Sequence, residues 1–564
     1  MSVKSQIVVT AVVLALLLNL GILSANAQAP SKAPRLPEKQ GDLPPRTGFV
    51  PPPMDLSHLT GERVPERFET LVLPIRWDWR EQGKVTSVKD QDTCGSCYAF
   101  ASVANIESKM LMDGAGTFDF SENNAKECNW YGTSCDGGNY TKMASWFSKE
   151  GTVLESCDPY APWDTTCKAT CTYKKTLLDW RIISGNSVPS ISVLQSYIYA
   201  YGPVYTSFYA GDANDPSWWS EFSNYDGSYT LYYTGSWAPN HAVLIVGWDD
   251  TLSHAGGYGA WIVKNSWGTS WGGTCGYGSE AGYFTIAYGS ASIGKYSSYM
   301  HDWQNYDQNG EVLYYDEGGW TDSWGYSDVT AWGLCKFVPA STSYLSRVEF
   351  WTNDSTTDID VYVYDDFDGS TLSNLLTSKL NQSYDEAGYH SVTLDSPPQI
   401  AASNDVYAAV KFTNSSYTYP VVADGQGPNE TGTTYISSNG GSGSWYDLGA
   451  GQAEDVAIRI RTTTYSGIDA ETVLEFPESF IITQNYPNPF NARTTIEYEL
   501  PAVSDVRVQI YDLVGRQVET LVNRDQKAGH HQIDWNPPDI PSGIYFYKVQ
   551  AGEFTATMKM LLLR

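Results

Sequence analysis

One cysteine of this sequence stands where a thiol could be activated as a nucleophile. Cys97 follows Gly95 and Ser96 and begins an apolar stretch without proline that continues to Leu111. Apolar residues recur there every three or four positions, which predicts a buried helix with Ser96 as its N-cap. A thiol in the first turn lies near the positive end of the helix dipole, which favours the thiolate.

A thiolate nucleophile needs an imidazole partner, and few histidines are available. Between residues 73 and 300 there are two, and His254 lies in a polar, glycine-rich turn, whereas His241 begins an apolar run of strand length. Asn265 could orient the far nitrogen of that imidazole through its amide oxygen. Gln91 could stabilise an oxyanion together with the backbone amide of Cys97. These four residues, Cys97, His241, Asn265 and Gln91, are the candidate catalytic site for acyl transfer.

Cys94 and Cys97 could instead form half of a zinc site, a redox pair or a disulfide. A zinc site needs a second cysteine or histidine pair at similar spacing, and none is evident in the sequence. The chain has nine cysteines, so at least one lacks an intramolecular partner. A catalytic thiol accounts for that cysteine, and we predict neither a metal nor a cofactor.

Length and composition indicate several folded domains. A chain of 564 residues is too long for one hydrophobic core, so about three domains are expected. The net charge of −29 argues against nucleic acid as a partner. A hydrophobic content of 42% excludes a disordered chain, and 40 tyrosines and 20 tryptophans suit β-rich extracellular domains.

The N-terminus predicts export. Lys4, the apolar run of residues 7–23 and the small residues before Gln28 are typical of a signal peptide, residues 1–27, cleaved after Ala27. A membrane anchor is the alternative, since the apolar run approaches a spanning length. No later segment could span a bilayer, so we expect a protein without a transmembrane anchor that is secreted or held at the cell surface, where disulfides persist.

Residues 28–72, called the leader below, are rich in proline. Residues 28–73 contain nine prolines and little apolar periodicity, which predicts an extended or disordered segment. A propeptide is one interpretation, and a linker ahead of the first domain is the other.

The stretch from Gln91 to Phe100 resembles the active-site segment of papain-like cysteine peptidases, with Tyr98 where the family more often has tryptophan. Three further motifs carry the same resemblance: Cys135-Asp-Gly-Gly138, Asn240-His-Ala-Val-Leu-Ile-Val-Gly-Trp248 and Asn265-Ser-Trp-Gly-Thr-Ser-Trp-Gly. The resemblance implies a two-lobed α+β peptidase over residues 73–296. It also implies a longer, helical propeptide, whose motif is missing from this leader.

The resemblance assigns further roles. It implies that Gly137 and Gly138 let substrate backbone lie against the cleft wall as an added strand. It implies a specificity pocket for a neutral or apolar side chain, with these lining residues: Asn139, Tyr140, Ser207, Pro239 and Asn240. Trp267 would cover the histidine–asparagine pair. It further implies a disulfide between Cys94 and Cys135 and a second one from Cys128 to either Cys167 or Cys171. Cys157 would pair with whichever of these two is left.

After residue 297 the pattern changes to strands and turns. Alternation in residues 358–364 indicates a half-buried strand, and similar runs at residues 345–351 and 406–412 favour an antiparallel sandwich. Residues 297–465 resemble the lectin-like β-domain that follows papain-like domains in some bacterial proteins, and their aromatics could stack on glycans. Residues 365–369 could bind calcium or form an aspartate-rich hairpin turn.

The last segment, residues 466–564, forms a third unit. Its strands alternate, as at Ile496, Tyr498 and Leu500. It resembles the immunoglobulin-like C-terminal sorting domain of the type IX secretion system, which implies the secretion machinery as a partner. A generic immunoglobulin-like spacer is the alternative.

The sequence therefore predicts a multidomain protein: a papain-like peptidase, an all-β sandwich and an Ig-like β-sandwich. We expect a secreted cysteine endopeptidase that hydrolyses protein and peptide substrates. The alternative function is a surface adhesin that binds glycans and carries a vestigial peptidase domain.

Overall fold

The computed structural model describes residues 29–35, 46–62, 68, 71–129, 134–440, 445–464, 481–482, 484–491, 493–500, 504–526, 529–537, 540–552 and 554–563. The predicted signal peptide lies outside them. The chain divides into two compact units, Met1–Ser466 and Gly467–Arg564, which are described separately.

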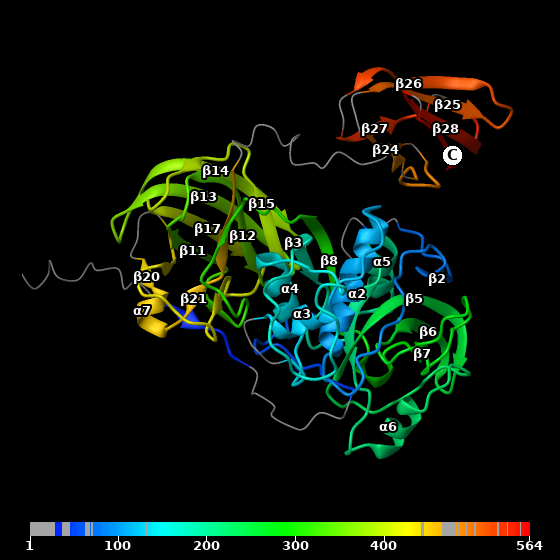
Figure 1. Ribbon diagram of the computed structural model, residues 1–564, viewed down its shortest axis with the longest axis horizontal. Helices are drawn as coiled ribbons and strands as arrows, with labels where there is room; N and C mark the ends of the chain where they lie inside the picture. Colours follow the sequence, from blue (N-terminus) through cyan, green and yellow to red (C-terminus); the bar gives the residue numbers. More distant parts are fainter. Residues whose placement is uncertain are drawn as a thin grey trace, which may run out of the picture. The chain divides into compact units, whose positions relative to one another are not determined.

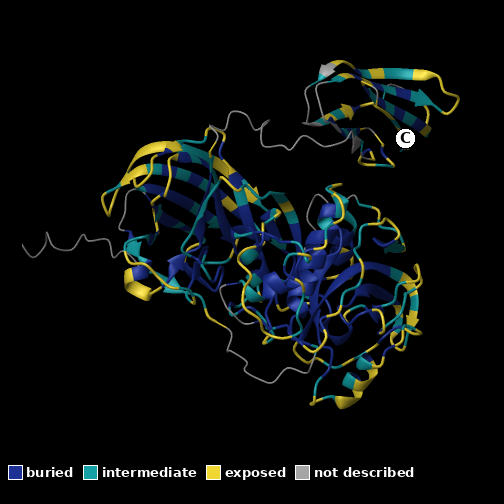
Figure 2. Ribbon diagram, in the orientation of Figure 1, coloured by how far each residue is buried: buried dark blue, intermediate teal, exposed yellow. Residues whose placement is uncertain are grey.

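The first lobe of the larger unit is built on the helix that begins at the candidate nucleophile (Figure 1). Helix α2 (Cys97–Met112) is buried over most of its length (Figure 2). The helices α3 (Glu122–Glu127) and α4 (Tyr140–Lys149) pack against it. Ser121 caps α3 by accepting a hydrogen bond from the amide of Asn124 at 2.9 Å.

The second lobe is an antiparallel sheet in the order β7-β6-β5-β4-β8-β3. Its strands, with β2 at the side of β5, are β2 (Arg76–Asp78), β3 (Lys175–Ile182), β4 (Val204–Phe208), β5 (His241–His254), β6 (Gly257–Lys264), β7 (Tyr283–Ala287) and β8 (Lys295–Asn305). The helices α5 (Ile191–Tyr201), α6 (Pro216–Ser223) and the 3-10 turn η2 (Ser290–Ser292) complete it. His241 is the first residue of β5 and Asn265 follows the last residue of β6, so this hairpin brings the two together.

The sheet continues without a break into the next domain. Strand β15 pairs with β3, with Tyr389 opposite Trp180, and the sheet runs on through β12 and β22 to β9. The predicted boundary between the two domains, between residues 296 and 297, falls within β8. Because the two domains share this sheet, the boundary stays a prediction.

The lectin-like region is a sandwich of the shared sheet, a six-stranded sheet and a small sheet beside them. Its strands are β9 (Val312–Leu313), β10 (Asp322–Gly325), β11 (Thr330–Phe337), β12 (Ser343–Thr352), β13 (Thr357–Phe367), β14 (Leu372–Tyr384), β15 (Ala387–Thr393), β16 (Gln399–Ile400), β17 (Val406–Asn414), β18 (Val421–Asp424), β19 (Thr434–Ser437), β20 (Tyr446–Asp447), β21 (Asp455–Val456) and β22 (Ile458–Thr463), with the helix α7 (Leu448–Gln452). Ile359, Val361 and Val363 are buried, as their alternation predicts. Residues 365–369 lie in the β13–β14 hairpin, where Asp368 Oδ1 accepts bonds from Ser370 and Thr371, so the turn interpretation holds.

The smaller unit consists of two antiparallel sheets, β23-β24-β27 and β26-β25-β28-β29. Its strands are β23 (Ile481–Ile482), β24 (Thr494–Leu500), β25 (Ser504–Asp512), β26 (Gln517–Gln526), β27 (Gly529–Trp535), β28 (Gly543–Ala551) and β29 (Phe554–Leu562). Ile496, Tyr498 and Leu500 point into its core. The predicted fold class is thus confirmed for all three parts.

The described parts of the leader are extended and lie on both domains of the larger unit. Strand β1 (Ser31–Lys32) pairs with β10, whereas Phe49 and Leu56 are buried in the core around α2. The leader is therefore an integral part of this unit. Among all described residues, no helix has the length and apolar composition to cross a membrane.

Candidate active site

Cys97 occupies the first turn of α2 as a free thiol that is fully buried. Its Sγ accepts a hydrogen bond from the amide of Ala242, the residue after His241, at 3.3 Å. Ser96 holds the N-cap position, but its hydroxyl does not cap the helix. It bonds instead to the hydroxyl of Tyr160 at 2.7 Å. The sulfur thus lies beside the strand that carries the candidate base.

His241 is paired with Asn265. Its Nε2 lies 2.8 Å from Asn265 Oδ1, which also accepts the amide of Ser266 at 2.9 Å. The other ring nitrogen, Nδ1, is buried and has no hydrogen-bond partner among the described residues. This arrangement fixes the ring and leaves one nitrogen available for chemistry.

Three aromatic rings surround the imidazole. The ring centres of Trp267, Phe208 and Phe222 lie 5.3, 5.7 and 6.5 Å from that of His241. Trp267 was expected there from its motif. Phe208 and Phe222 were missed, because they come from β4 and α6, which carry no motif that points to the histidine. The rings exclude water from the bond to Asn265.

Gln91 is fully buried and is held by groups from both lobes. Its Nε2 donates to the carbonyl of Cys94 at 2.8 Å, and its Oε1 accepts the hydroxyl of Ser266 at 2.6 Å. The hydroxyl of Tyr160 also donates to the Gln91 carbonyl at 2.8 Å. The amide has a second hydrogen that could serve an oxyanion. Ser266 and Tyr160 are positioning residues that the sequence did not reveal, although Ser266 belongs to the Asn265 motif.

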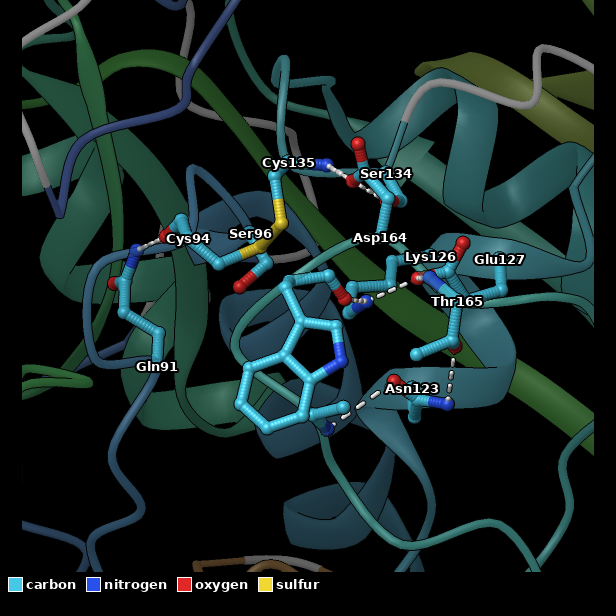
Figure 3. The surroundings of a disulfide bond; sticks show 12 residues. Gln91, Cys94, Ser96, Asn123, Lys126, Glu127, Ser134, Cys135, Asp164 and Thr165 are labelled. Atoms are coloured by element: carbon cyan, nitrogen blue, oxygen red, sulfur yellow. Dashed lines mark hydrogen bonds and ion pairs between the residues drawn. A yellow bond between two sulfur atoms is a disulfide. The ribbon is translucent and has the colours of Figure 1, made fainter.

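A disulfide joins the nucleophile loop to the glycine-containing wall of the cleft (Figure 3). Cys94 pairs with Cys135, and the amide of Cys135 donates to Asp164 Oδ1 at 3.0 Å. The other two disulfides are Cys128–Cys167 and Cys157–Cys171. The implied pairing of Cys94 is therefore present, and Cys128 takes the first of its two expected partners.

The cleft is not empty: residues 46–50 of the leader run along it. The amides of Gly48 and Phe49 donate to the carbonyl of Asn240 at 3.1 and 3.0 Å. Gly138 donates to the carbonyl of Gly48 at 2.9 Å and accepts the amide of Val50 at 3.0 Å. A peptide strand is thus bonded to both walls of the cleft.

The same segment continues beyond these bonds at each end. Trp267 Nε1 donates to the carbonyl of Arg46 at 3.0 Å, and Asn139 Nδ2 donates to that of Val50 at 3.0 Å. Most of the expected substrate-binding residues therefore contact one stretch of chain. The leader pairs with this wall in parallel register, with Phe49 opposite Gly138, and the expectation that substrate backbone lies there stays a prediction.

Glycines make this close approach possible. A Cβ on Gly48 would lie 1.8 Å from the carbonyl oxygen of Gly95, and one on Gly138 would lie 2.7 Å from the ring of Tyr98. Gly137 has φ of 101° and could not carry a side chain without meeting Gly48.

The side chain of Phe49 is buried in the apolar cluster that also contains Cys97. It is 1% exposed, its ring centre lies 5.2 Å from that of Tyr296, and both belong to this cluster with Tyr140 and Tyr205. Ser207 has its hydroxyl bonded to the Lys295 carbonyl at 3.0 Å. The side chain of Asn240 is bonded to residues 210 and 211, so this residue offers its backbone to the leader.

Burial sets the protonation of the site. It raises the pKa of the Cys97 thiol to about 12, although the hydrogen bond from the Ala242 amide and the nearby backbone amides of Tyr98 and Gly48 lower it. It lowers the pKa of His241 to about 4, and the bond to Asn265 offsets only part of that effect. Near pH 7 the pair is therefore a neutral thiol and a neutral imidazole.

Comparison with known proteins identifies all three domains. Family models match for papain family cysteine protease at residues 73–301, lectin like domain at 312–462 and secretion system C-terminal sorting domain at 484–563. The expected three-part architecture is thus confirmed. The crystal structure of the cysteine protease and lectin-like domains of Cwp84, a surface layer associated protein of Clostridium difficile, has a TM-score of 0.62 at 18% identity and covers 78% of this chain and 99% of that chain. The shared fold includes both domains.

Curated relatives match over the peptidase region. A cathepsin L-like proteinase of Fasciola hepatica is 33% identical over 238 residues, which are 41% of this chain and 65% of the relative. Falcipain-3 of Plasmodium falciparum is 33% identical over 218 residues, 38% of this chain and 40% of its own length. Cysteine proteinase 1 of Entamoeba histolytica is 30% identical over 236 residues, 40% of this chain and 68% of its own length. On these matches and the family model, the chain belongs to the papain family of cysteine proteases.

Proposed function

We propose that this chain is the precursor of an exported cysteine endopeptidase that hydrolyses peptide bonds in proteins. The observation that carries this proposal is a peptide strand, residues 46–50, bonded along a cleft that contains a free thiol and a histidine–asparagine pair. A cleft with these groups can bind, attack and release a peptide of similar shape.

The chemistry follows from the roles of the four residues. Once the cleft is open, the Cys97 thiol transfers its proton to His241 Nδ1, and the thiolate attacks the carbonyl carbon of the substrate. The oxyanion is stabilised by the Cys97 amide and the free hydrogen of Gln91 Nε2. The imidazolium protonates the leaving amine, which leaves a thioester on Cys97. Water, deprotonated by His241, then hydrolyses the thioester and restores the thiol.

The leader acts as the propeptide. It holds the Gly48 amide against the Asn240 carbonyl and close to the sulfur of Cys97, so that leader backbone occupies the space in front of the nucleophile. It also buries both members of the catalytic pair in their neutral forms. The helical propeptide of the family is replaced here by an extended segment that uses the cleft and the lectin-like domain as its supports.

The course of the leader supports endopeptidase action. Its chain enters at Trp267 and leaves at Asn139, with bonds to the carbonyls of Arg46 and Val50. The cleft therefore accommodates the middle of a chain and needs neither terminus.

The aromatic face of the six-stranded sheet favours glycan binding as a second function of the same protein. Trp332 stacks on Tyr362 with ring centres 5.4 Å apart, and Tyr364 continues the row at 6.2 Å. Trp332 lies on β11 and the two tyrosines lie on β13, and all three rings are partly exposed where they pack against a second, smaller apolar cluster of this sheet. Sugar rings stack on such platforms. A glycan-bound enzyme would be concentrated on its substrate, and the sorting domain would bring it outside the cell.

Peptide hydrolysis tests the proposal. The purified full chain is incubated until the leader is cut, and its digest of a peptide library is compared with that of the Cys97→Ala chain. Hydrolysis and labelling by an epoxide thiol inhibitor are expected from the first and absent from the second. Equal hydrolysis by both would contradict the proposal. Glycan-array binding without any hydrolysis would favour the adhesin alternative.

A further inference from the structure

The leader has a second support, far along the chain from the catalytic cleft. Strand β1 pairs with β10 of the lectin-like domain in antiparallel register, with Lys32 opposite Trp324. The amide of Ala33 donates to the Ser323 carbonyl at 2.8 Å. Strand β10 pairs with β18 on its other side, so β1 covers the edge of a small sheet.

Two buried carboxylates accompany this edge. The Asp322 side chain is 0% exposed and the Glu454 side chain 7% exposed. Asp322 receives Lys32 Nζ at 3.0 Å and Arg35 Nε at 2.6 Å, and a second Arg35 nitrogen reaches its other oxygen. Glu454 bonds to Lys32 and to Trp324 Nε1, the latter at 2.7 Å.

The site is shaped around these cations. A Cβ on Gly425 would lie 2.5 Å from Asp322 Oδ2, 2.9 Å from Arg35 and 3.0 Å from Glu454. Glycine is therefore required for the cations to reach both carboxylates. The backbone pairing of β1 uses no side chain, so the lysine and the arginine supply the sequence preference.

Removal of the leader would leave an unstable arrangement. With the leader gone, Asp322 loses both of its cations and Glu454 loses its lysine, so two carboxylates are left without the charges that compensated them. Strand β10 would also lose the partner of its N–H and C=O groups. Both effects favour a new occupant with the same features.

We propose that strand β10 with Asp322 and Glu454, called the acidic edge, is a binding site for extended basic peptides with a lysine and an arginine three positions apart. In the precursor the leader occupies it through Lys32 and Arg35. In the mature enzyme the same site binds a basic segment of a protein substrate and holds that substrate on the enzyme. This inference rests on the proposed removal of the leader and goes beyond peptide hydrolysis itself.

The test measures peptide binding by a chain that cannot hydrolyse peptides. A recognition site for an added specific protease is placed in residues 36–45 of the full Cys97→Ala chain, and the chain is cut after folding. Mass spectrometry verifies the cut. A fluorescent peptide with the sequence of residues 29–35 is then titrated into the chain, and if the cut piece stays bound, its displacement by the peptide is measured instead.

Saturable binding of one peptide per chain is expected. A peptide with Lys32→Glu and Arg35→Glu should bind at least about 30-fold more weakly, because two charge-assisted contacts are lost. The Asp322→Asn, Glu454→Gln chain should lose binding to the original peptide to a similar extent, and Asp358→Asn, which changes an exposed carboxylate of β13, should not. The peptide variants test the proposal even if the buried substitutions prevent folding.

Two further peptides separate the proposal from simpler explanations. A peptide that keeps only the lysine and the arginine, three positions apart in an alanine and serine background, should bind within about tenfold of the original, since the backbone supplies the rest. A scrambled peptide of equal charge should bind poorly. If the scrambled peptide bound equally well, general attraction by the net charge of −29 would explain the binding, and the proposal would be overturned. The proposal would also be overturned if the peptide with the leader sequence bound and the peptide with only the lysine and the arginine in an alanine and serine background did not. Peptide binding is measured in a chain that cannot hydrolyse peptides, so failure of the proposed peptidase function in the parent protein would not change the result.

Discussion

The carbonyl oxygen of Asn240 accepts a hydrogen bond from the amide of Gly48 at 3.1 Å. Asn240 directly precedes His241, so the leader is bonded next to the strand that begins with the proposed catalytic base. We therefore expect departure of the leader to change the surroundings of the imidazole.

Replacement of the nucleophile should abolish activity without loss of the fold. In the Cys97→Ala protein after leader removal, peptide hydrolysis should fall by at least about 10³-fold, because no other thiol lies beside His241. The measurement is kcat/KM on a fluorogenic peptide together with labelling by an epoxide inhibitor. Cys275→Ala, which removes another free and partly exposed cysteine, should leave both unchanged. An active Cys97→Ala protein would show that a different group is the nucleophile.

Loss of the Asn265 amide should change both the rate and its pH dependence. The hydrogen bond from His241 to Asn265 raises the pKa of the imidazole. Without it the imidazolium gives up its proton at lower pH, so the alkaline limb of the kcat/KM profile should move towards acid. Asn265→Ala should also lower kcat by about 10² because the ring is no longer oriented.

A pH profile of kcat/KM for Asn265→Ala against the parent enzyme checks this prediction. Asn404→Ala removes an exposed asparagine of the lectin-like domain and should retain the parent profile. An unshifted alkaline limb would mean that the amide has no electrostatic role.

The core of this site could be predicted from sequence because its residues lie in local motifs. Cys97, His241 and Asn265 each begin or follow an element whose apolar periodicity is clear. The supports of these residues come from distant segments instead. Phe208 reaches the imidazole through the register of β4 on β5, where it lies opposite His241. Only the tertiary structure shows such a contact.

The leader illustrates the same limit. Its prolines indicate extended chain, but its course depends on hydrogen bonds that its backbone makes with Asn240 and Gly138. Backbone bonds leave little trace in sequence. The need for glycine at position 48 becomes visible only when the carbonyl of Gly95 is seen beside it.

Acid should loosen the precursor. Burial lowers the pKa of His241 from 6.5 to about 4, so the closed state binds fewer protons than the open one. The stability that the closed state gains from a neutral His241 is complete above pH 6.5. This stability is lost as the pH falls towards 4, and the loss reaches at most about 3 kcal/mol. Thiol labelling of the precursor should accelerate over this range.

The Cys97 thiol predicts a loss of precursor stability at alkaline pH. Its pKa is raised from 9.0 to about 12, so that its contribution is complete below pH 9 and is lost at higher pH. The measurement is the unfolding free energy of the precursor against pH, with His241→Gln as the comparison. If His241→Gln shows the same acid dependence, other groups are responsible.

A side chain at Gly48 should open the cleft. In Gly48→Ala the new Cβ would meet the Gly95 carbonyl at 1.8 Å, and backbone cannot move away as a flexible side chain could. The leader should leave the cleft, and labelling of Cys97 in the uncut precursor should rise by at least about tenfold, which corresponds to about 1.4 kcal/mol. Ser57→Ala, at an exposed leader position, is the matched control. Unchanged labelling of Gly48→Ala would show that other contacts keep the cleft closed.

The junction of the peptidase and lectin-like domains should control the stability of both. Arg459 of β22 forms bonds of 2.8 and 2.6 Å with the two oxygens of Asp316, and both side chains are almost completely buried. The same guanidinium donates to the hydroxyls of Ser148 and Ser145 on α4, at 2.7 and 3.0 Å. Arg459→Met would leave the Asp316 carboxylate buried without its cation, which costs about 3–5 kcal/mol.

Urea unfolding of the uncut Cys97→Ala chain measures this cost. We expect one transition for the larger unit that moves to lower urea in Arg459→Met, because the shared sheet through β3 and β15 joins the two domains. Lys379→Met, which removes an exposed pair with Asp395, should cost less than about 1 kcal/mol. Adding Asp316→Leu to Arg459→Met should recover much of the loss, since no buried charge remains. Two separate transitions in the parent protein would mean that the sheet does not couple the domains.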